Sequence, residues 1–213
     1  MYDIIFFDLD GTLTEPAEGI CNSFRYALQK MGIEENDAAK LFSYIGPPLG
    51  DTFAKYGFEG EAQDAAIRYY REYFGSRGKF ENRVYDGVPQ MLAELKKQGK
   101  KLVVATSKLE KFSVEIVEHF GLAQYFDFVA GASADGSISK KKDVLEYAFR
   151  RAGVTDKSRA VMVGDRHYDV TGAIEAGIDC IGVTYGYGSR EELESAGARY
   201  IATTVQDLLK HII

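Results

Sequence analysis

The sequence Ile4-Ile5-Phe6-Phe7-Asp8-Leu9-Asp10-Gly11-Thr12 lies close to the start of the chain. A short run of β-branched and aromatic residues bounded by a glycine predicts a buried strand over residues 4–9. Ligands bind at the carboxyl ends of strands in open α/β sheets, which makes Asp8 and Asp10 candidate site residues. Gly11 allows a sharp turn that brings the second carboxylate around a ligand. An isolated Asp-x-Asp strand end is also typical of a solvated turn. Other residues must therefore decide between a ligand site and such a turn.

Similar apolar runs alternate with helical patterns along most of the chain. Candidate strands cover residues 4–9, 101–106, 126–130, 160–164, 180–184 and 199–202. Between them, apolar residues recur at helical spacing, as in Phe112, Ile116, Val117 and Phe120, and again in Val144, Leu145, Ala148 and Phe149. This alternation predicts an α/β fold in which helices cover a parallel sheet.

The stretch from Thr14 to Glu81 breaks this alternation. It has helical stripes, such as Ile20, Phe24 and Leu28, but no expected strand. Its Gly46-Pro47-Pro48 sequence predicts a rigid bend between two helices. We therefore expect a helical domain at residues 14–81, inserted into an α/β domain made of residues 1–13 and 82–213.

Composition limits the possible partners. The 213 residues carry a net charge of -6 and are 46% hydrophobic, which suits a chain with a sizeable core but disfavours nucleic-acid or anionic-membrane surfaces. Cys21 and Cys180 have no paired spacing that would indicate a disulfide framework or a zinc site. No signal peptide and no apolar run of about 20 residues is evident. We expect a cytoplasmic protein, monomeric or homodimeric, with no nucleic-acid or membrane partner.

Two further strand ends carry polar residues. Thr106 and Ser107 follow the second strand, where a hydroxyl and free amides at a helix start can bind a phosphate oxygen. The fourth strand ends in Gly164-Asp165-Arg166-His167-Tyr168-Asp169. Because Mg²⁺ prefers oxygen ligands, carboxylates from the first and fourth strands form a plausible partial magnesium site.

A lysine run, Lys140-Lys141-Lys142, opens the helix before the fourth strand. Three lysines usually form a solvated positive face, yet the side chain of one of them can point toward the carboxylate cluster and offset the repulsion between its carboxylates. Spacing to the following helix favours Lys141, with Lys140 left open as the alternative.

In this order, the motifs resemble those of the haloacid dehalogenase-like hydrolases: an Asp-x-Asp-Gly-Thr strand end, a Thr or Ser strand end, a lysine and a Gly-Asp-x-x-x-Asp strand end. The resemblance covers essentially the full chain. It implies a three-layer, Rossmann-like, doubly wound core with an inserted all-helical cap. One departure is the absence of the proline that often follows the family lysine, which bears on the choice between Lys140 and Lys141.

The resemblance also implies residue roles. Asp8 attacks phosphorus to form an aspartyl-phosphate, and Asp10 protonates the leaving alcohol and then activates water. Mg²⁺ is held by Asp8, the Asp10 backbone carbonyl and Asp165, with Asp169 in support. The substrate phosphate is bound by Gly11, Thr106, Ser107 and Lys141.

The expected activity is therefore magnesium-dependent hydrolysis of a small phosphorylated metabolite. Residues 45–49 and 80–88 resemble the branch that contains phosphoglycolate phosphatases and bacterial 5′-nucleotidase-like proteins. We expect a phosphoglycolate phosphatase-like enzyme, with a nucleoside monophosphate phosphatase as the alternative. A sugar-phosphate mutase and an inactive phospholigand-binding protein remain open. Asp10 argues against a dehalogenase, because a halide leaving group needs no proton.

Overall fold

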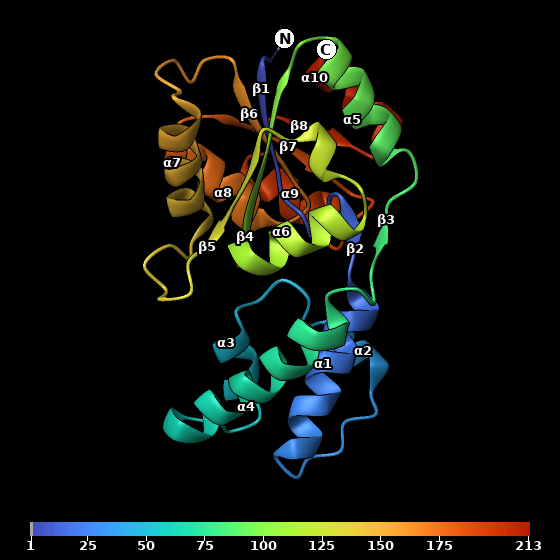
Figure 1. The fold of residues 1–213 in the computed structure, drawn as a ribbon, viewed down its shortest axis with the longest axis vertical. Coiled ribbons are helices and arrows are strands. Elements are labelled where there is room, and N and C mark those ends of the chain that lie inside the picture. Colours follow the sequence, from blue (N-terminus) through green and yellow to red (C-terminus); the bar gives the residue numbers. More distant parts are fainter. Residues whose placement is uncertain (1) are drawn as a thin grey trace. The chain divides into compact units, whose positions relative to one another are not determined.

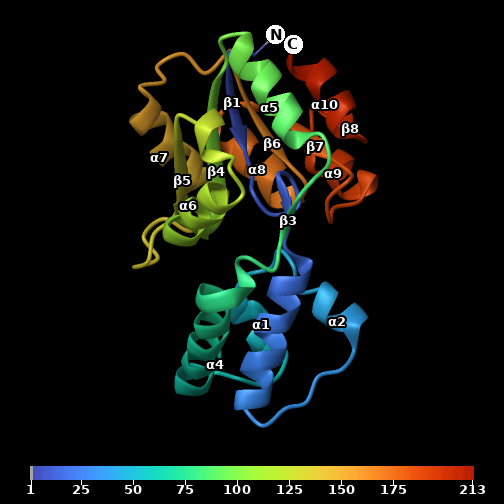
Figure 2. The same ribbon diagram turned by 45° about the vertical axis from the view of Figure 1, so that its right-hand side comes forward.

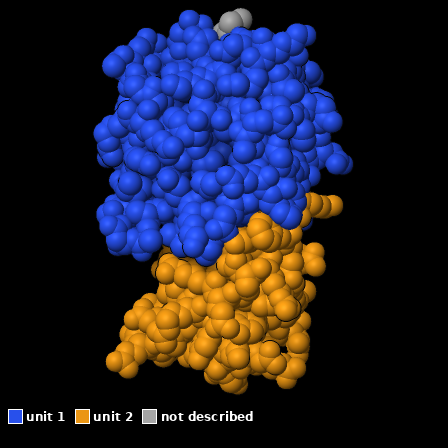
Figure 3. Space-filling model, viewed as in Figure 1, with its two compact units in different colours: residues 1–15, 84–213 blue, residues 16–83 orange. Residues whose placement is uncertain are grey.

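Alternating strands and helices build most of the computed structural model, which describes residues 2–213. The chain divides into two compact units, one of residues 1–15 and 84–213 and the other of residues 16–83 (Figure 3). Each unit is considered by itself. Whether the units are independent domains with the expected boundaries stays a prediction.

Unit 1 is built around a six-stranded parallel sheet with the strand order β5-β4-β1-β6-β7-β8. Its strands are β1 (Ile4–Phe7), β4 (Lys101–Leu109), β5 (Phe128–Ala132), β6 (Ala160–Gly164), β7 (Asp179–Val183) and β8 (Tyr200–Ala202). Phe7 at the end of β1 lies opposite Val104 on one side and Val163 on the other. The carboxyl ends of β1 and β6 therefore lie together at one edge, where the strand order reverses, while β4 runs on beside them to Leu109.

Helices cover both faces of this sheet, as the views in Figures 1 and 2 show. One face packs against α7 (Lys141–Ala152), α8 (His167–Ala176) and α9 (Arg190–Ala196). The other packs against α5 (Val88–Lys97), α6 (Glu110–His119) and α10 (Val205–Ile212), with a short 3-10 turn, η2 (Ala123–Tyr125), beside α5 and α6. This confirms the predicted α/β class and its doubly wound, three-layer arrangement.

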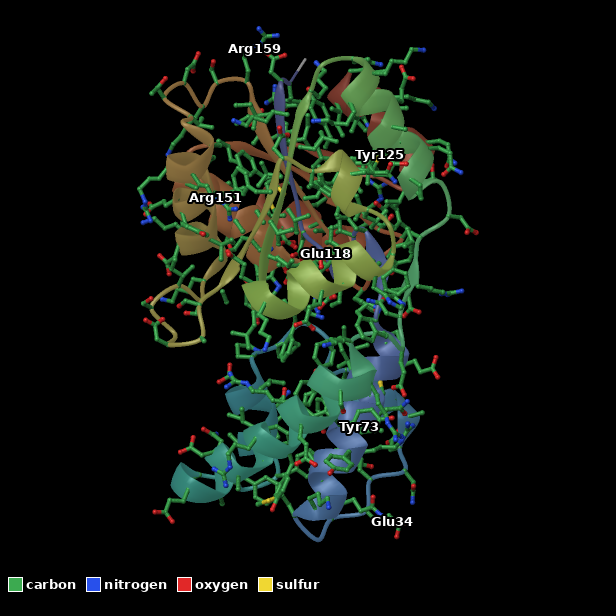
Figure 4. All side chains as sticks on the ribbon, in the orientation of Figure 1. Glu34, Tyr73, Glu118, Tyr125, Arg151 and Arg159 are labelled. Carbon is green, nitrogen blue, oxygen red and sulfur yellow. The ribbon has the colours of Figure 1, made fainter. Side chains whose placement is uncertain are left out.

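Burial explains why β1 is apolar along its length. Ile5, Phe6 and Phe7 have no exposed surface, as expected for a central strand covered on both faces. The Phe6 ring meets the Phe149 ring of α7 edge-to-face, with centroids 5.1 Å apart. Arg151, labelled in Figure 4, donates from α7 to the Val129 carbonyl of β5 at 2.9 Å. These contacts fix α7, and with it the lysine at its first turn, against the sheet.

Unit 2 is helical, with α1 (Ala17–Lys30), α2 (Ala38–Phe42), α3 (Leu49–Ala54), α4 (Gly60–Tyr73) and the π-helical turn η1 (Phe74–Gly78). Its core forms around Phe24, whose ring lies 4.8 Å from that of Tyr70 and 5.4 Å from those of Tyr44 and Phe53. Tyr73, labelled in Figure 4, donates from α4 to Glu81 at 2.9 Å. Tyr70 is buried and belongs to this core.

Two local expectations differ from the structure. The stretch from Thr14 was expected to hold no strand, yet Thr14–Glu15 forms β2, which pairs with β3 (Arg83–Val84) where the chain leaves and re-enters the sheet unit. Such a two-residue strand has too little hydrophobic periodicity to be recognised in a sequence. The second difference, at the end of β4, is described with the site below. Among residues 2–213, no helix is both long enough and apolar enough to cross a membrane.

Candidate active site

Three carboxylates meet at the edge where β1 and β6 end. Asp8 follows β1, and its backbone N–H donates to the Val163 carbonyl of β6 at 2.9 Å. Asp165 follows β6, and Asp169 lies in the first turn of α8. One ligand oxygen from each of the three lies within 4.8 Å of the others. Adjacent parallel strands that end together bring Asp8 close to Asp165 and Asp169, although more than 150 positions separate Asp8 from either residue in the chain.

Lys141 is the cation of this cluster. Its Nζ lies 2.8 Å from Asp8 Oδ1 and 2.8 Å from Asp169 Oδ1, and it donates to the Ala105 carbonyl at 2.9 Å. Burial by itself lowers the pKa of Lys141, but the facing carboxylates of Asp169 and Asp8 raise it overall. The ammonium is therefore charged, and all three of its donor directions have an acceptor within reach.

The neighbouring lysines point elsewhere. Lys140 precedes the first residue of α7 and is exposed. Lys142 is half-exposed and lies 3.9 Å from Glu146 on its own helix. Successive helical residues project about 100° apart, so a single lysine of the three can face the carboxylates. The structure brings Lys141 to Asp8, whereas the side chains of Lys140 and Lys142 reach solvent.

Asp165 is held by neutral donors. The Tyr187 backbone N–H donates to its Oδ2 at 2.8 Å, and the Thr12 hydroxyl reaches its Oδ1 at 3.4 Å. Gly11 lies against the same carboxylate: a Cβ at this position would stand 2.2 Å from Asp165 Oδ2, and its φ of +80° favours glycine. The turn after Asp10 can therefore approach Asp165 only because residue 11 has no side chain.

Burial dominates the electrostatics of the acidic cluster. It raises the pKa of Asp165, and the neighbouring charges of Asp169 and Asp8 raise it further. Burial also raises the pKa of Asp169, even though the ammonium of Lys141 acts in the opposite direction. A second cation placed among these oxygens would offset the repulsion that remains. Carboxylate oxygens converging at this spacing suit a hard divalent ion such as Mg²⁺.

Asp10 forms an ion pair with a different lysine, Lys108. Its Oδ2 lies 2.6 Å from the Nζ of Lys108, while its Oδ1 is buried and has no hydrogen-bond partner among residues 2–213. Burial raises the pKa of Asp10, against the lowering effect of Lys108. This arrangement favours a carboxyl group that can hold a proton more readily than an exposed aspartate.

Thr106 is buried beside the cluster, but its surroundings differ from the expected helix start. β4 continues to Leu109 and α6 begins at Glu110, with an irregular register between Ala105 and Leu109. The Thr106 hydroxyl accepts from the Lys108 backbone N–H at 3.3 Å. Ser107 is exposed. The prediction that residues 106–107 open a helix is therefore wrong, because the strand runs on along β5 before the chain turns.

Some supporting residues could not be identified from the sequence. The sequence did not mark Lys108 as a site residue, because a single lysine near the end of a strand is common. The loop after β7 has no sequence pattern that distinguishes it from an ordinary turn, yet the Tyr187 backbone N–H supports Asp165, and the Tyr187 hydroxyl donates to Glu15 at 2.9 Å. The Tyr185 hydroxyl donates to the Thr12 carbonyl at 3.1 Å. His167, the histidine nearest the site in sequence, contacts Glu192 at 2.8 Å.

Comparisons with known proteins agree with this geometry. Residues 5–183 match the family described as haloacid dehalogenase-like hydrolase. A 5′-nucleotidase of Pseudomonas aeruginosa is 43% identical over 195 residues, which cover 91% of this chain and 88% of that protein. The tyrosine-protein kinase PtkA of Mycobacterium tuberculosis is 41% identical over 207 residues, which cover 96% of this chain and 70% of that protein.

A solved structure extends the comparison to three dimensions. The crystal structure of a predicted phosphatase from Clostridium acetobutylicum has a TM-score of 0.94 and 49% sequence identity, and the match covers 100% of this chain and 98% of that one. The sequence motifs, the parallel sheet and these matches lead to one conclusion: the chain belongs to the haloacid dehalogenase-like hydrolase family, among its phosphatases.

Proposed function

We propose that this protein is a magnesium-dependent phosphatase that hydrolyses nucleoside 5′-monophosphates through a phosphorylated Asp8. The observation that carries the proposal is the position of the Asp8 carboxylate, which lies at the carboxyl edge of the sheet, 2.8 Å from the Lys141 ammonium and within 4.8 Å of ligand oxygens of Asp165 and Asp169. A carboxylate can attack a phosphate dianion only where nearby cations neutralise the charge of both groups.

Magnesium binding is supported by the donor set. Asp8 and Asp165 offer the converging oxygens, and the Tyr187 amide and the Thr12 hydroxyl donate to Asp165, whereas Asp169 faces the ammonium of Lys141. We assign Asp8, Asp165 and the Asp10 backbone carbonyl as ligands and Asp169 as the residue that positions the lysine. When bound, the ion supplies charge neutralisation for the phosphoryl oxygens and orients the phosphate for in-line attack.

The residues of the chain then divide the reaction into two displacements. Asp8 attacks phosphorus while Asp10 gives a proton to the departing alcohol oxygen. Asp10 then takes a proton from water, which attacks the phosphorylated Asp8 and releases phosphate. Lys141, the Thr106 hydroxyl and the amides of Gly11 and Ser107 stabilise the phosphoryl oxygens through both steps.

We base the proposed substrate on the proteins that this chain is similar to. The 43% identity to a 5′-nucleotidase over most of both chains favours a nucleoside 5′-monophosphate over the phosphoglycolate that we expected first from the sequence. We further propose that the helical unit, residues 16–83, contributes substrate selection, because its insertion directly follows the motif that ends at Thr12.

A panel of phosphomonoesters tests this proposal. Phosphate release is measured with and without Mg²⁺ for nucleoside 5′-monophosphates, phosphoglycolate, sugar phosphates and p-nitrophenyl phosphate. The highest kcat/KM is expected for a nucleoside 5′-monophosphate, with loss of turnover when a chelator removes the metal. A preference for phosphoglycolate would restore the sequence-based expectation, and conversion of a sugar phosphate to its isomer would indicate a mutase. Turnover of no ester would favour a phospholigand-binding protein.

One relative favours a second candidate function. The tyrosine-protein kinase PtkA matches nearly the whole chain, and a phosphorylated aspartate can pass its phosphoryl group to a tyrosine hydroxyl instead of water. Incubation with labelled ATP and a tyrosine-containing protein substrate distinguishes the two. Release of inorganic phosphate without labelling of tyrosine is the outcome expected from the hydrolase proposal.

A further inference from the structure

Lys108 and Asp10 form an ion pair that none of the roles above uses. The Lys108 Nζ lies 2.6 Å from Asp10 Oδ2, and the two side chains are 11% and 21% exposed. We propose that Lys108 is a positioning residue that selects which oxygen of Asp10 exchanges protons with the substrate. This inference rests on the proposed phosphatase function and adds a residue to its machinery.

The two oxygens of Asp10 have different surroundings. Oδ2 faces the ammonium, whereas Oδ1 is buried and has no partner among residues 2–213. Buried carboxylate oxygens are normally hydrogen-bonded, so an unpaired one indicates a donor that belongs to another molecule. The leaving alcohol and the attacking water are donors of this kind. Oδ1 is therefore the oxygen that exchanges the proton, and Lys108 keeps Oδ2 from competing with it.

The backbone around Lys108 is well fixed, which a positioning role requires. Its N–H donates to the buried Thr106 hydroxyl at 3.3 Å. On the neighbouring strand β5, the N–H of Gly131 donates to the Glu110 carboxylate at 3.1 Å. A Cβ at Gly131 would stand 2.8 Å from the Lys108 carbonyl oxygen, so the two strands approach closely here. A lysine anchored at both its backbone and its ammonium can hold a carboxylate in one orientation.

The role can be written for each displacement. In the first, a bond forms between Asp8 and phosphorus, the bond from phosphorus to the alcohol oxygen breaks, and that oxygen takes the proton held on Asp10 Oδ1. In the second, water attacks phosphorus, its proton goes to Oδ1, and the bond from phosphorus to Asp8 breaks to release phosphate. Lys108 gives up no proton and contacts no reacting atom in either step.

The test uses two esters that differ in how much their leaving group needs a proton. Phenyl phosphate releases a more basic phenolate than p-nitrophenyl phosphate, and kcat/KM reports the step in which that group departs. For Lys108→Met we expect kcat/KM to fall by about tenfold to a hundredfold for phenyl phosphate and by less than about threefold for p-nitrophenyl phosphate. Lys108→Arg keeps the charge and should restore most of the loss.

Controls separate positioning from other roles. Lys111→Met, at an exposed lysine on α6, should leave both esters unchanged. Circular dichroism of Lys108→Met should match that of the original chain. Equal losses for both esters, or a change confined to KM, would overturn the inference, because they indicate that Lys108 binds phosphate or supports the fold. If the unsubstituted protein turned over no ester of the wider panel, the proposed function itself would fail, which is a separate result.

Discussion

Lys141 is a buried cation of the site. It is 5% exposed and lies between two carboxylates, each 2.8 Å from its ammonium. Removing one partner of a buried ion pair typically destabilises a protein by about 3–5 kcal/mol, because the remaining charges are left uncompensated. In the proposed mechanism the same lysine offsets charge as Asp8 meets a phosphate. Its loss should therefore affect both stability and catalysis.

We predict that Lys141→Met lowers kcat/KM by about a hundredfold to a thousandfold. In the absence of Mg²⁺, the free energy of unfolding should fall by about 3–5 kcal/mol, measured by urea denaturation. Lys142→Met is the matched control, because its ammonium is half-exposed and its ion pair of 3.9 Å contributes little. Similar activities for the two variants would remove Lys141 from the mechanism.

Residues that carry charge at strand ends could be predicted from the sequence, since carboxylates after an apolar strand stand out. Asp8, Asp165 and Lys141 do meet at one edge, although their catalytic roles stay predictions. The partner of Asp10 could not be predicted, because Lys108 reaches it through an extension of β4 that the sequence pattern does not reveal. Pairing between side chains on different strands depends on register and packing, which hydrophobic periodicity alone does not determine.

At the scale of single elements, the loop after β7 has an unexpectedly close fit to the site. A Cβ at Gly186 would stand 2.2 Å from the Gly11 carbonyl oxygen and 2.6 Å from Asp165 Oδ2. The next residue, Tyr187, donates its N–H to the same carboxylate. This loop therefore supports a proposed metal ligand through its backbone, which requires a glycine at the point of closest approach.

We predict that Gly186→Ala displaces the loop, lowers kcat/KM by more than about tenfold and raises the Mg²⁺ concentration needed for half-maximal activity. The added methyl group should also destabilise the protein by about 1–3 kcal/mol, because the backbone atoms in its way cannot rotate aside. Gly50→Ala in α3 is the control, since its new Cβ would meet nothing closer than 3.6 Å. Unchanged magnesium dependence in Gly186→Ala would show that the loop does not hold Asp165.

Elements with a long apolar run were predictable, and short or irregular ones were not. β1 and β6 were found near their observed bounds because every one of their residues is apolar or small, and all but Ile4 are fully buried. β2 and β3, of two residues each, have no such pattern. The residues of the β4 extension, such as Thr106 and Lys108, are polar, so the sequence pattern predicted an earlier end for this strand. Tertiary pairing with β5 maintains it there.

The chain consists of a sheet unit that holds all the proposed catalytic side chains and a helical unit with its own aromatic core. Because Asp8, Lys141 and Asp165 all belong to unit 1, their chemistry should not require residues 16–83. Natural substrates offer more surface than a phosphoryl group, and we propose that the helical unit selects among them.

We predict that replacing residues 16–83 with a short linker between Glu15 and Val84 preserves slow hydrolysis of p-nitrophenyl phosphate. Discrimination between nucleoside 5′-monophosphates and phosphoglycolate, measured as a ratio of kcat/KM values, should fall by about tenfold or more, because binding energy from the non-reacting part of the substrate is lost. The unsubstituted chain is assayed in parallel. A ratio that did not change would assign selection to unit 1.

Asp8 is the nucleophile of the proposed mechanism, and phosphate release by Asp8→Asn at saturating Mg²⁺ tests this role. Asparagine has nearly the same shape as aspartate but is a poor nucleophile and carries no charge to bind a cation. We predict a rate at least about a thousandfold below that of the unsubstituted protein, with an unchanged circular dichroism spectrum. A variant that kept a substantial fraction of the original rate on the same ester would contradict it.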